Sequence, residues 1–235
     1  MKEIKKAFTL AEVLITLGVI GVVAVMTMSV IIKNIQHKTL ESQFKKSYSQ
    51  LSQVLEQARM EFGILETTDY DDIREYISNK YNKGKVIDNF ETSYINSFLT
   101  YSKLSAGKGI RANCFDKVNT INKRFINSDG SFMAICLHNY YGIMISVDTN
   151  GYKGPNRFGY DLFFFRLVNS KLSYFIDINR NCTETENCPN YGYITEGSPC
   201  SKSSTKLTNG ISCVRYALTN TCPDDANKKY WECLP

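Results

Sequence analysis

A single carboxylate, Glu12, lies near the start of a run of residues, 8–32, that is otherwise almost entirely apolar. A carboxylate in such a segment costs on the order of 2–3 kcal/mol on membrane-insertion scales, so we expect it to have a partner. Cleavage between Ala7 and Phe8 would supply one, because it creates an amino group four residues before Glu12. In a helical assembly, that ammonium on one chain could pair with the carboxylate of the next chain. The two costly charges would then neutralise each other.

The cysteines are the second set of candidate functional residues, and all of them lie in the later part of the chain. They are Cys114, Cys136, Cys182, Cys188, Cys200, Cys213, Cys222 and Cys233. An even number of cysteines in an exported region predicts four disulfides, although eight cysteines allow 105 pairings. The loop between Cys182 and Cys188 is sterically easy to close, but the spacing does not choose a pairing. A structural metal is disfavoured, because there is no C-x-x-C pair and the histidines, His37 and His138, lie far from the cysteine-rich end.

A third group of residues brings side-chain oxygens together on a loop rich in glycine. Asp148, Asn150, Asn156 and Asp161 lie in this stretch, residues 147–161. Calcium takes six to eight oxygen ligands, so these residues could hold a calcium ion. Their spacing does not match an EF-hand, and the same residue types are what tight turns require. A calcium site and a structural turn are therefore alternatives, of which we favour the turn. No other cofactor is predicted.

The apolar run itself is long enough to span a membrane, since about 20 apolar residues cover the hydrocarbon core. Residues 1–7 before it are short and basic, which predicts that the leader stays cytoplasmic and the rest of the chain is exported. The run is too long for the apolar part of a secretory signal peptide, and no small-residue cleavage site follows it before Lys33. An uncleaved membrane anchor is the alternative, but it leaves Glu12 without a partner.

The sequence of residues 7–24, AFTLAEVLITLGVIGVVA, resembles the cleavage and methylation segment of type IV prepilins and type II secretion pseudopilins. The resemblance implies that prepilin peptidase cuts after Ala7 and that the new amino group of Phe8 is N-methylated. It also implies that Glu12, fifth in the mature chain, guides the docking of subunits. The family usually has Gly where this chain has Ala7, and many members have Pro where it has Ser29.

This resemblance implies a structural subunit of a type IV pilus or a type II secretion pseudopilus. Its partners would be prepilin peptidase and other pilin or pseudopilin subunits in a helical filament. The chain would wait in the bacterial inner membrane as a single-pass protein with an exported C-terminal domain, then enter a periplasmic or cell-surface filament. The large cysteine-rich domain favours a minor subunit. A filament-tip adhesion or DNA-uptake protein and an uncleaved, signal-anchored periplasmic protein are the alternatives.

Composition and motifs weigh against other classes of function. The leader contributes +2 of the formal net charge of +5, and the remaining lysines are scattered, so no specific nucleic-acid partner is predicted. The sequence holds no P-loop, no G-x-S-x-G and no H-E-x-x-H motif. We therefore predict that the chain is not an enzyme.

Beyond the apolar run, the pattern predicts an α+β fold. Apolar residues recur at three- and four-residue steps up to Phe62, so one helix should run from Phe8 to Phe62, with Gly63 as its stop signal and its later half packed on a sheet. Further helices are expected at 69–82 and 89–100, and antiparallel strands at 131–136, 141–147, 161–167 and 172–176, with turns at 129–130 and 150–151.

The chain should therefore have five parts in sequence. We expect a leader at 1–7, a membrane and assembly helix at 8–32, and an amphipathic continuation of that helix at 33–62. A globular α+β domain should occupy 63–179. A disulfide-rich region dominated by loops should occupy 180–235.

Overall fold

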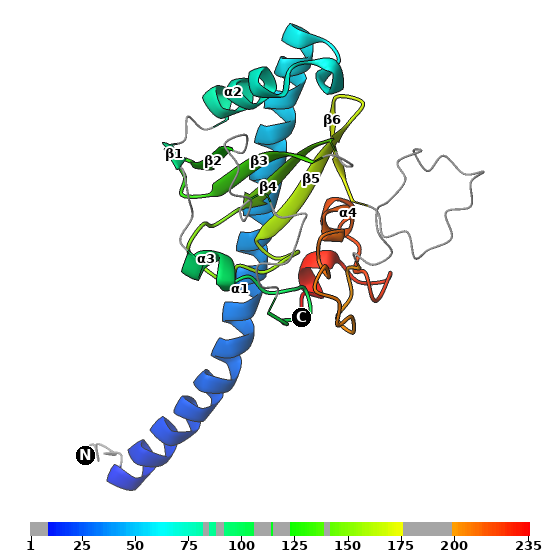
Figure 1. Ribbon diagram of the computed structural model, residues 1–235. Helices are drawn as coiled ribbons and strands as arrows, with labels where there is room; N and C mark the ends of the chain where they lie inside the picture. Colours follow the sequence, from blue (N-terminus) through cyan, green and yellow to red (C-terminus); the bar gives the residue numbers. More distant parts are fainter. Residues whose placement is uncertain are drawn as a thin grey trace. The chain divides into compact units, whose positions relative to one another are not determined.

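The computed structural model describes residues 9–81, 85–87, 92–105, 114, 123–138, 142–175 and 199–235 (Figure 1). The predicted cleavage site at Ala7 and Phe8, and the cysteines Cys182 and Cys188, lie outside these ranges. The chain forms two compact units, Met1–Thr39 and Leu40–Pro235, which we describe separately.

Helix α1, Leu10–Phe62, confirms the predicted long helix over the part of the chain that the structure describes. Between residues 10 and 32 its large apolar side chains are 42–79% exposed, so no part of the first unit covers them. The helix ends at Gly63, whose φ of 81° is in the left-handed region and whose N–H donates to the Arg59 carbonyl at 2.9 Å. Gly63 therefore acts as the C-terminal stop that its sequence position predicts.

The second unit contains a six-stranded antiparallel sheet in which each strand pairs with the next along the chain (Figure 1). The strands are β1, Lys85–Ile87; β2, Lys123–Ile126; β3, Phe132–His138; β4, Gly142–Asp148; β5, Leu162–Val168; and β6, Lys171–Tyr174. The four predicted strands correspond to β3–β6, with bounds that differ by one or two residues. The sequence prediction missed β1 and β2, which are short and have no clear alternation.

The second half of α1 covers one face of this sheet. Phe44 lies 4.4 Å from Phe163 of β5 and 5.5 Å from Trp231, measured between ring centroids. Leu51 and Leu55, about two and three turns further along, are fully buried in the same core cluster. The amphipathic stripe predicted for this part of the helix therefore packs on the sheet, and the α+β fold class is confirmed.

The other face of the sheet carries a second core cluster. Helix α3, Thr92–Asn96, is much shorter than the helix predicted at 89–100 and contributes Tyr94 to this cluster. Cys114 is fully buried here and forms a disulfide with Cys136 of β3. Its N–H donates to the Ser146 hydroxyl of β4 at 3.2 Å, so the disulfide holds this point of the chain against the sheet.

Residues 199–235 belong to the same unit and the same core as the sheet. Disulfides join Cys200 to Cys213 and Cys222 to Cys233, so the predicted disulfide bonding is confirmed for six of the eight cysteines. Helix α4, Cys213–Thr219, begins at the second cysteine of the first disulfide, and the short 3-10 helix η2, Tyr230–Glu232, follows it. The sequence predicted a region dominated by loops here and so missed α4. Seven residues give too few helical turns for a periodic signal.

The end of α1 is tied to the hairpin between β5 and β6. After α1 come the 3-10 helix η1, Leu65–Thr67, and helix α2, Tyr70–Lys80, close to the helix predicted at 69–82. The Ser170 N–H donates to both carboxylate oxygens of Glu66, at 2.8 and 3.0 Å, and its hydroxyl donates at 2.9 Å. Ser170 has a φ of 57°, so these bonds hold a residue in a conformation that non-glycine residues seldom adopt.

Candidate functional site

The start of α1 places Glu12, the residue predicted to guide assembly, in contact with Thr9. The Thr9 N–H and the Thr9 hydroxyl both donate to Glu12 Oε2 at 2.9 Å. The Glu12 N–H donates in return to the Thr9 hydroxyl oxygen at 3.3 Å. The Thr9 carbonyl accepts the first helical hydrogen bond, from Val13 N–H at 3.3 Å. Thr9 is therefore the N-cap of α1, and the pair forms a capping box.

The capping box gives Glu12 a partner within its own chain. The carboxylate accepts a backbone and a hydroxyl donor that would otherwise be unpaired at the start of an apolar helix. A negative charge in the first helical turn is also favoured by the helix dipole. The sequence prediction considered only a charged partner and missed Thr9, although the spacing Thr-x-x-Glu before an apolar run is the known signal of a capping box.

Beyond Glu12, the apolar surface of α1 contains two glycines, which have no side chain. Gly18 and Gly21 lie three residues apart and so share a face of the helix. A Cβ atom added at either position would meet no atom within 4 Å. Neither glycine is therefore needed for packing against another described residue. Glycines at this spacing allow the backbones of two membrane helices to approach closely.

Among the described residues, α1 is the one helix long and apolar enough to cross a membrane, and its best 18-residue window has a mean hydropathy of 2.5. None of that window is buried, unlike the core helix of a soluble protein, which would meet the same criteria of length and composition. A cleaved signal sequence would also meet them. The first half of α1 fits a single-pass membrane anchor in these respects.

The second candidate site, the loop between β4 and β5, uses its two carboxylates as hydrogen-bond acceptors. Asp148 Oδ1 accepts the N–H groups of Asn150 and Gly151 at 3.1 and 2.9 Å, and Oδ2 accepts the Tyr94 hydroxyl at 2.7 Å. Asp161 accepts the N–H groups of Asn156 and Arg157 at 2.9 and 2.6 Å. Both carboxylates therefore fasten turns of the loop.

These carboxylates are fully buried, and no described residue forms an ion pair with either of them. Burial, followed by repulsion from Asp161, raises the pKa of Asp148 well above its ordinary value. Burial raises the pKa of Asp161 to about 6. Within the described ranges, no three His, Cys, Asp or Glu side chains gather in a way that could hold a metal. The hydrogen bonds fit the structural turn that the sequence favours over calcium.

None of the protein-family models, curated proteins or solved structures compared with this chain matches it. The class of protein must therefore be argued from the chain's own residues. The two features that bear on it are the apolar helix with its capping box and the disulfide-bonded α+β domain.

The role of Thr9 as the helix cap can be tested by replacing it with an isosteric apolar residue. Thr9→Val should cost about 1 kcal/mol of helix-start stability, because it removes the hydroxyl that pairs with Glu12. The exchange rate of the Glu12 amide hydrogen, measured by NMR in lipid nanodiscs, should rise about fivefold. Thr16→Val is the matched control, since the Thr16 hydroxyl bonds only to the Val13 carbonyl within the helix. An equal effect of the two substitutions would argue against the cap.

The buried carboxylates predict that stability falls as the pH rises above about 4. Their pKa values are higher in the folded chain than in the unfolded chain, so the folded state binds more protons. Each group then lowers the free energy of unfolding by about 1.4 kcal/mol per pH unit, between its unfolded and folded pKa values. Urea unfolding in EDTA between pH 4 and 6, followed by the fluorescence of Trp231, should show this slope.

Asp148→Asn is the variant that isolates this effect. The amide oxygen can still accept from Asn150 and Gly151, and the new NH₂ group can donate to the Tyr94 hydroxyl. The substitution should therefore remove about half of the slope between pH 4 and 6. Asp129, whose pKa is lowered by hydrogen bonds from Lys46 and Ser131 despite its partial burial, acts in the opposite sense and below this window. An unchanged slope in the variant would refute the assignment.

Proposed function

We propose that this chain is a minor structural subunit of a helical filament of the type IV pilus or type II secretion class. Prepilin peptidase would cut it after Ala7, and the mature chain would begin at Phe8. The observation that carries the proposal is Glu12. It is the single charge in the apolar run of residues 8–32, whose described large side chains are exposed, and it is the fifth residue of the proposed mature chain.

The uncovered apolar surface supports an assembling helix. The large side chains of residues 10–32 have no packing partner in the first unit, so lipid or other chains must cover them in the cell. In the membrane the lipid would do so. In the filament, the same surface would pack on the helices of neighbouring subunits, with Gly18 and Gly21 allowing close approach.

The capping box supports a specific role for Glu12 when the chain passes from the membrane into the filament. While the chain is stored in the membrane, Thr9 would hold the carboxylate by two hydrogen bonds and reduce the cost of its insertion. On assembly, the Phe8 ammonium of a neighbouring subunit would approach the same carboxylate. A carboxylate has about four lone-pair directions, so it can accept this charged donor without releasing Thr9.

The second unit supports export to an oxidising compartment. Three disulfides join described cysteines of this unit, and such bonds form and persist outside the cytosol. This fits a subunit whose C-terminal domain is exported across the inner membrane. It fits equally the alternative of an uncleaved, signal-anchored protein, which the N-terminus of the mature chain distinguishes from the filament subunit.

The mature N-terminus is the most direct test of this proposal. Mass spectrometry of the chain purified from its native membrane should find an N-terminal peptide that begins with N-methylated Phe8. Ala7→Gly, which restores the residue usual in the family, should be processed at least as completely. If the chain retains Met1 in cells with an active prepilin peptidase, the proposal that it is a filament subunit is ruled out.

Two substitutions separate the capping role of Glu12 from its charge. Glu12→Gln keeps a side chain that can close a capping box, whereas Glu12→Ala removes both the cap and the charge. We expect both variants to be exported and cleaved, and both to be lost from sheared filaments, because neither can pair with the Phe8 ammonium. Quantitative immunoblotting of filament and membrane fractions measures this. Normal incorporation of the Glu12→Gln subunit would show that the charge does not guide docking.

A further inference from the structure

The hairpin between β5 and β6 leaves β6 as an edge of the sheet with a defined hydrogen-bonding side. Its two loop residues, Asn169 and Ser170, both have positive φ, 52° and 57°, which is a type I′ turn. In such a two-residue hairpin the closing pair, Val168 and Lys171, is hydrogen-bonded.

Hydrogen-bonded and non-hydrogen-bonded residue pairs alternate along the two strands from this pair onward. The N–H and C=O groups of Leu172 and Tyr174 therefore point away from β5. No backbone hydrogen bond joins either residue to any other described residue on that outer side. With respect to the described residues, the outer side of β6 therefore presents two donors and two acceptors that a further strand could pair with.

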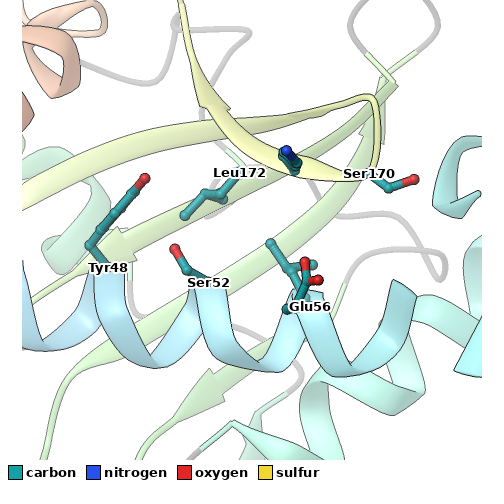
Figure 2. Close-up of a pocket in the computed structure, with 7 residues that line it drawn as sticks. Tyr48, Ser52, Glu56, Ser170 and Leu172 are labelled. Atoms are coloured by element: carbon teal, nitrogen blue, oxygen red, sulfur yellow. The ribbon is translucent and has the colours of Figure 1, made fainter. Parts of the chain in front are cut away.

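A cavity of about 230 Å³ lies between α1 and this hairpin (Figure 2). It is far larger than the ~10–15 Å³ that one water molecule requires on the same kind of measure. Its lining comes from the second half of α1 and from the hairpin: Tyr48, Ser52, Leu55, Glu56, Ser170, Lys171 and Leu172. None of these residues belongs to β5. The cavity therefore flanks β6 and does not lie beneath the body of the sheet.

The position of Leu172 relates the cavity to the open edge. Its side chain extends from β6 toward α1, on the same side as Ser52 and Glu56 (Figure 2). A strand added to β6 would lie about 4.8 Å further out, and its residue opposite Leu172 would place its side chain about 5 Å from that of Leu172 on the same face. That side chain would enter the cavity.

The chemistry of the lining defines what this side chain and its neighbours should be. Leu55 is buried, and Leu172 and Tyr48 pack against the core, so the walls favour an apolar side chain. At the rim, Glu56 is neutralised by Arg59, whereas Lys171 is exposed and no described carboxylate pairs with it. The rim therefore has an excess positive charge, which favours an acidic residue in the occupant.

We propose that the outer side of β6 and the adjoining cavity bind an extended segment of a partner polypeptide by strand addition. The partner contributes backbone hydrogen bonds to Leu172 and Tyr174, a leucine- or phenylalanine-sized side chain to the cavity, and an acidic residue near Lys171. Ser52 Oγ, which is buried beside the cavity without a hydrogen-bond partner among the described residues, lies where a polar group of the segment could reach it. This site lies in the second unit and does not depend on the proposed function of Glu12.

The test uses synthetic peptides of known register with the full chain in lipid nanodiscs. The peptides are acetylated, amidated heptapeptides of sequence Thr-Thr-Glu-X-Glu-Thr-Thr, in which X is Leu, Phe or Ala. When X lies opposite Leu172, a neighbouring Glu lies opposite Lys171. The Leu or Phe peptide should slow hydrogen exchange at the Leu172 and Tyr174 amides, and the Ala peptide should bind about tenfold more weakly. Replacing both Glu residues of the Leu peptide by Lys should weaken binding about two- to fivefold.

A substitution on α1 tests whether the cavity takes part. Ser52→Leu fills the cavity from the helix side without changing β6, so it should abolish binding of the Leu peptide. Ser49→Leu, on an exposed position of the same helix, is the matched control and should bind as the parent chain does. The fluorescence of Trp231 checks that both variants are folded.

Any of four results would overturn the proposal. Protection of the Leu172 and Tyr174 amides in the chain without peptide would mean that the edge is already covered. Equal binding of the Leu and Ala peptides, or unchanged binding by the folded Ser52→Leu variant, would mean that the cavity is not used. The absence of any protection at about 1 mM peptide would mean that the edge does not accept a strand.

Discussion

The apolar first half of α1 has no cover within its own unit, and the rest of the molecule's behaviour depends on this fact. Large apolar side chains that are 42–79% exposed between residues 10 and 32 cannot remain in contact with water. Lipid or other chains must cover them. The same surface can be satisfied by either, because a lipid tail is as apolar as a leucine side chain, so specificity in helix association must come from shape and from the few polar groups.

Glu12 and Thr9 are the polar groups that can supply such specificity near the start of this helix. Their capping box lowers the cost of keeping a carboxylate in an apolar segment, which explains how the residue can be tolerated in a single chain. It does not saturate the carboxylate. A charge-assisted hydrogen bond from a neighbouring amine is about twice as strong as a neutral one, so it would add to the local bonds in an assembly. Local capping and intermolecular docking are therefore compatible uses of one side chain.

How well the sequence predicts each helix or strand depends on the strength of its periodic pattern of apolar residues. The long helix and strands β3–β6 were predictable. Helix α1 runs for 53 residues, strands β3, β4 and β5 have seven each, and turn residues such as Asp129 and Gly130 separate β2 from β3. Strands β1 and β2 and helix α4 have three, four and seven residues, and their formation depends on pairing and packing that a local pattern does not encode.

The candidate sites show the same limit in a different form. Glu12 was recognisable because one charge in an apolar run is conspicuous, whereas Thr9 required the capping-box spacing to be considered. Pairings of Cys114, Cys200 and Cys222 could not be chosen, since any pairing depends on where the sheet brings distant residues together. Nor could the open side of β6 be predicted. It results from the order of strands and the turn at Asn169, which fix an edge only after the whole sheet has formed.

The second unit differs from the first in how it satisfies its surfaces. Its described core is covered on one face of the sheet by α1 and on the other by α3, Cys114 and neighbouring residues. Among the described residues, the outer side of β6 has no backbone partner, and the hydrogen bonding that it offers is directional and requires an extended partner. Apolar association through α1 tolerates many neighbours, whereas strand pairing demands register. A partner bound at β6 would therefore be selected by strand register, independently of the contacts that the apolar helix makes.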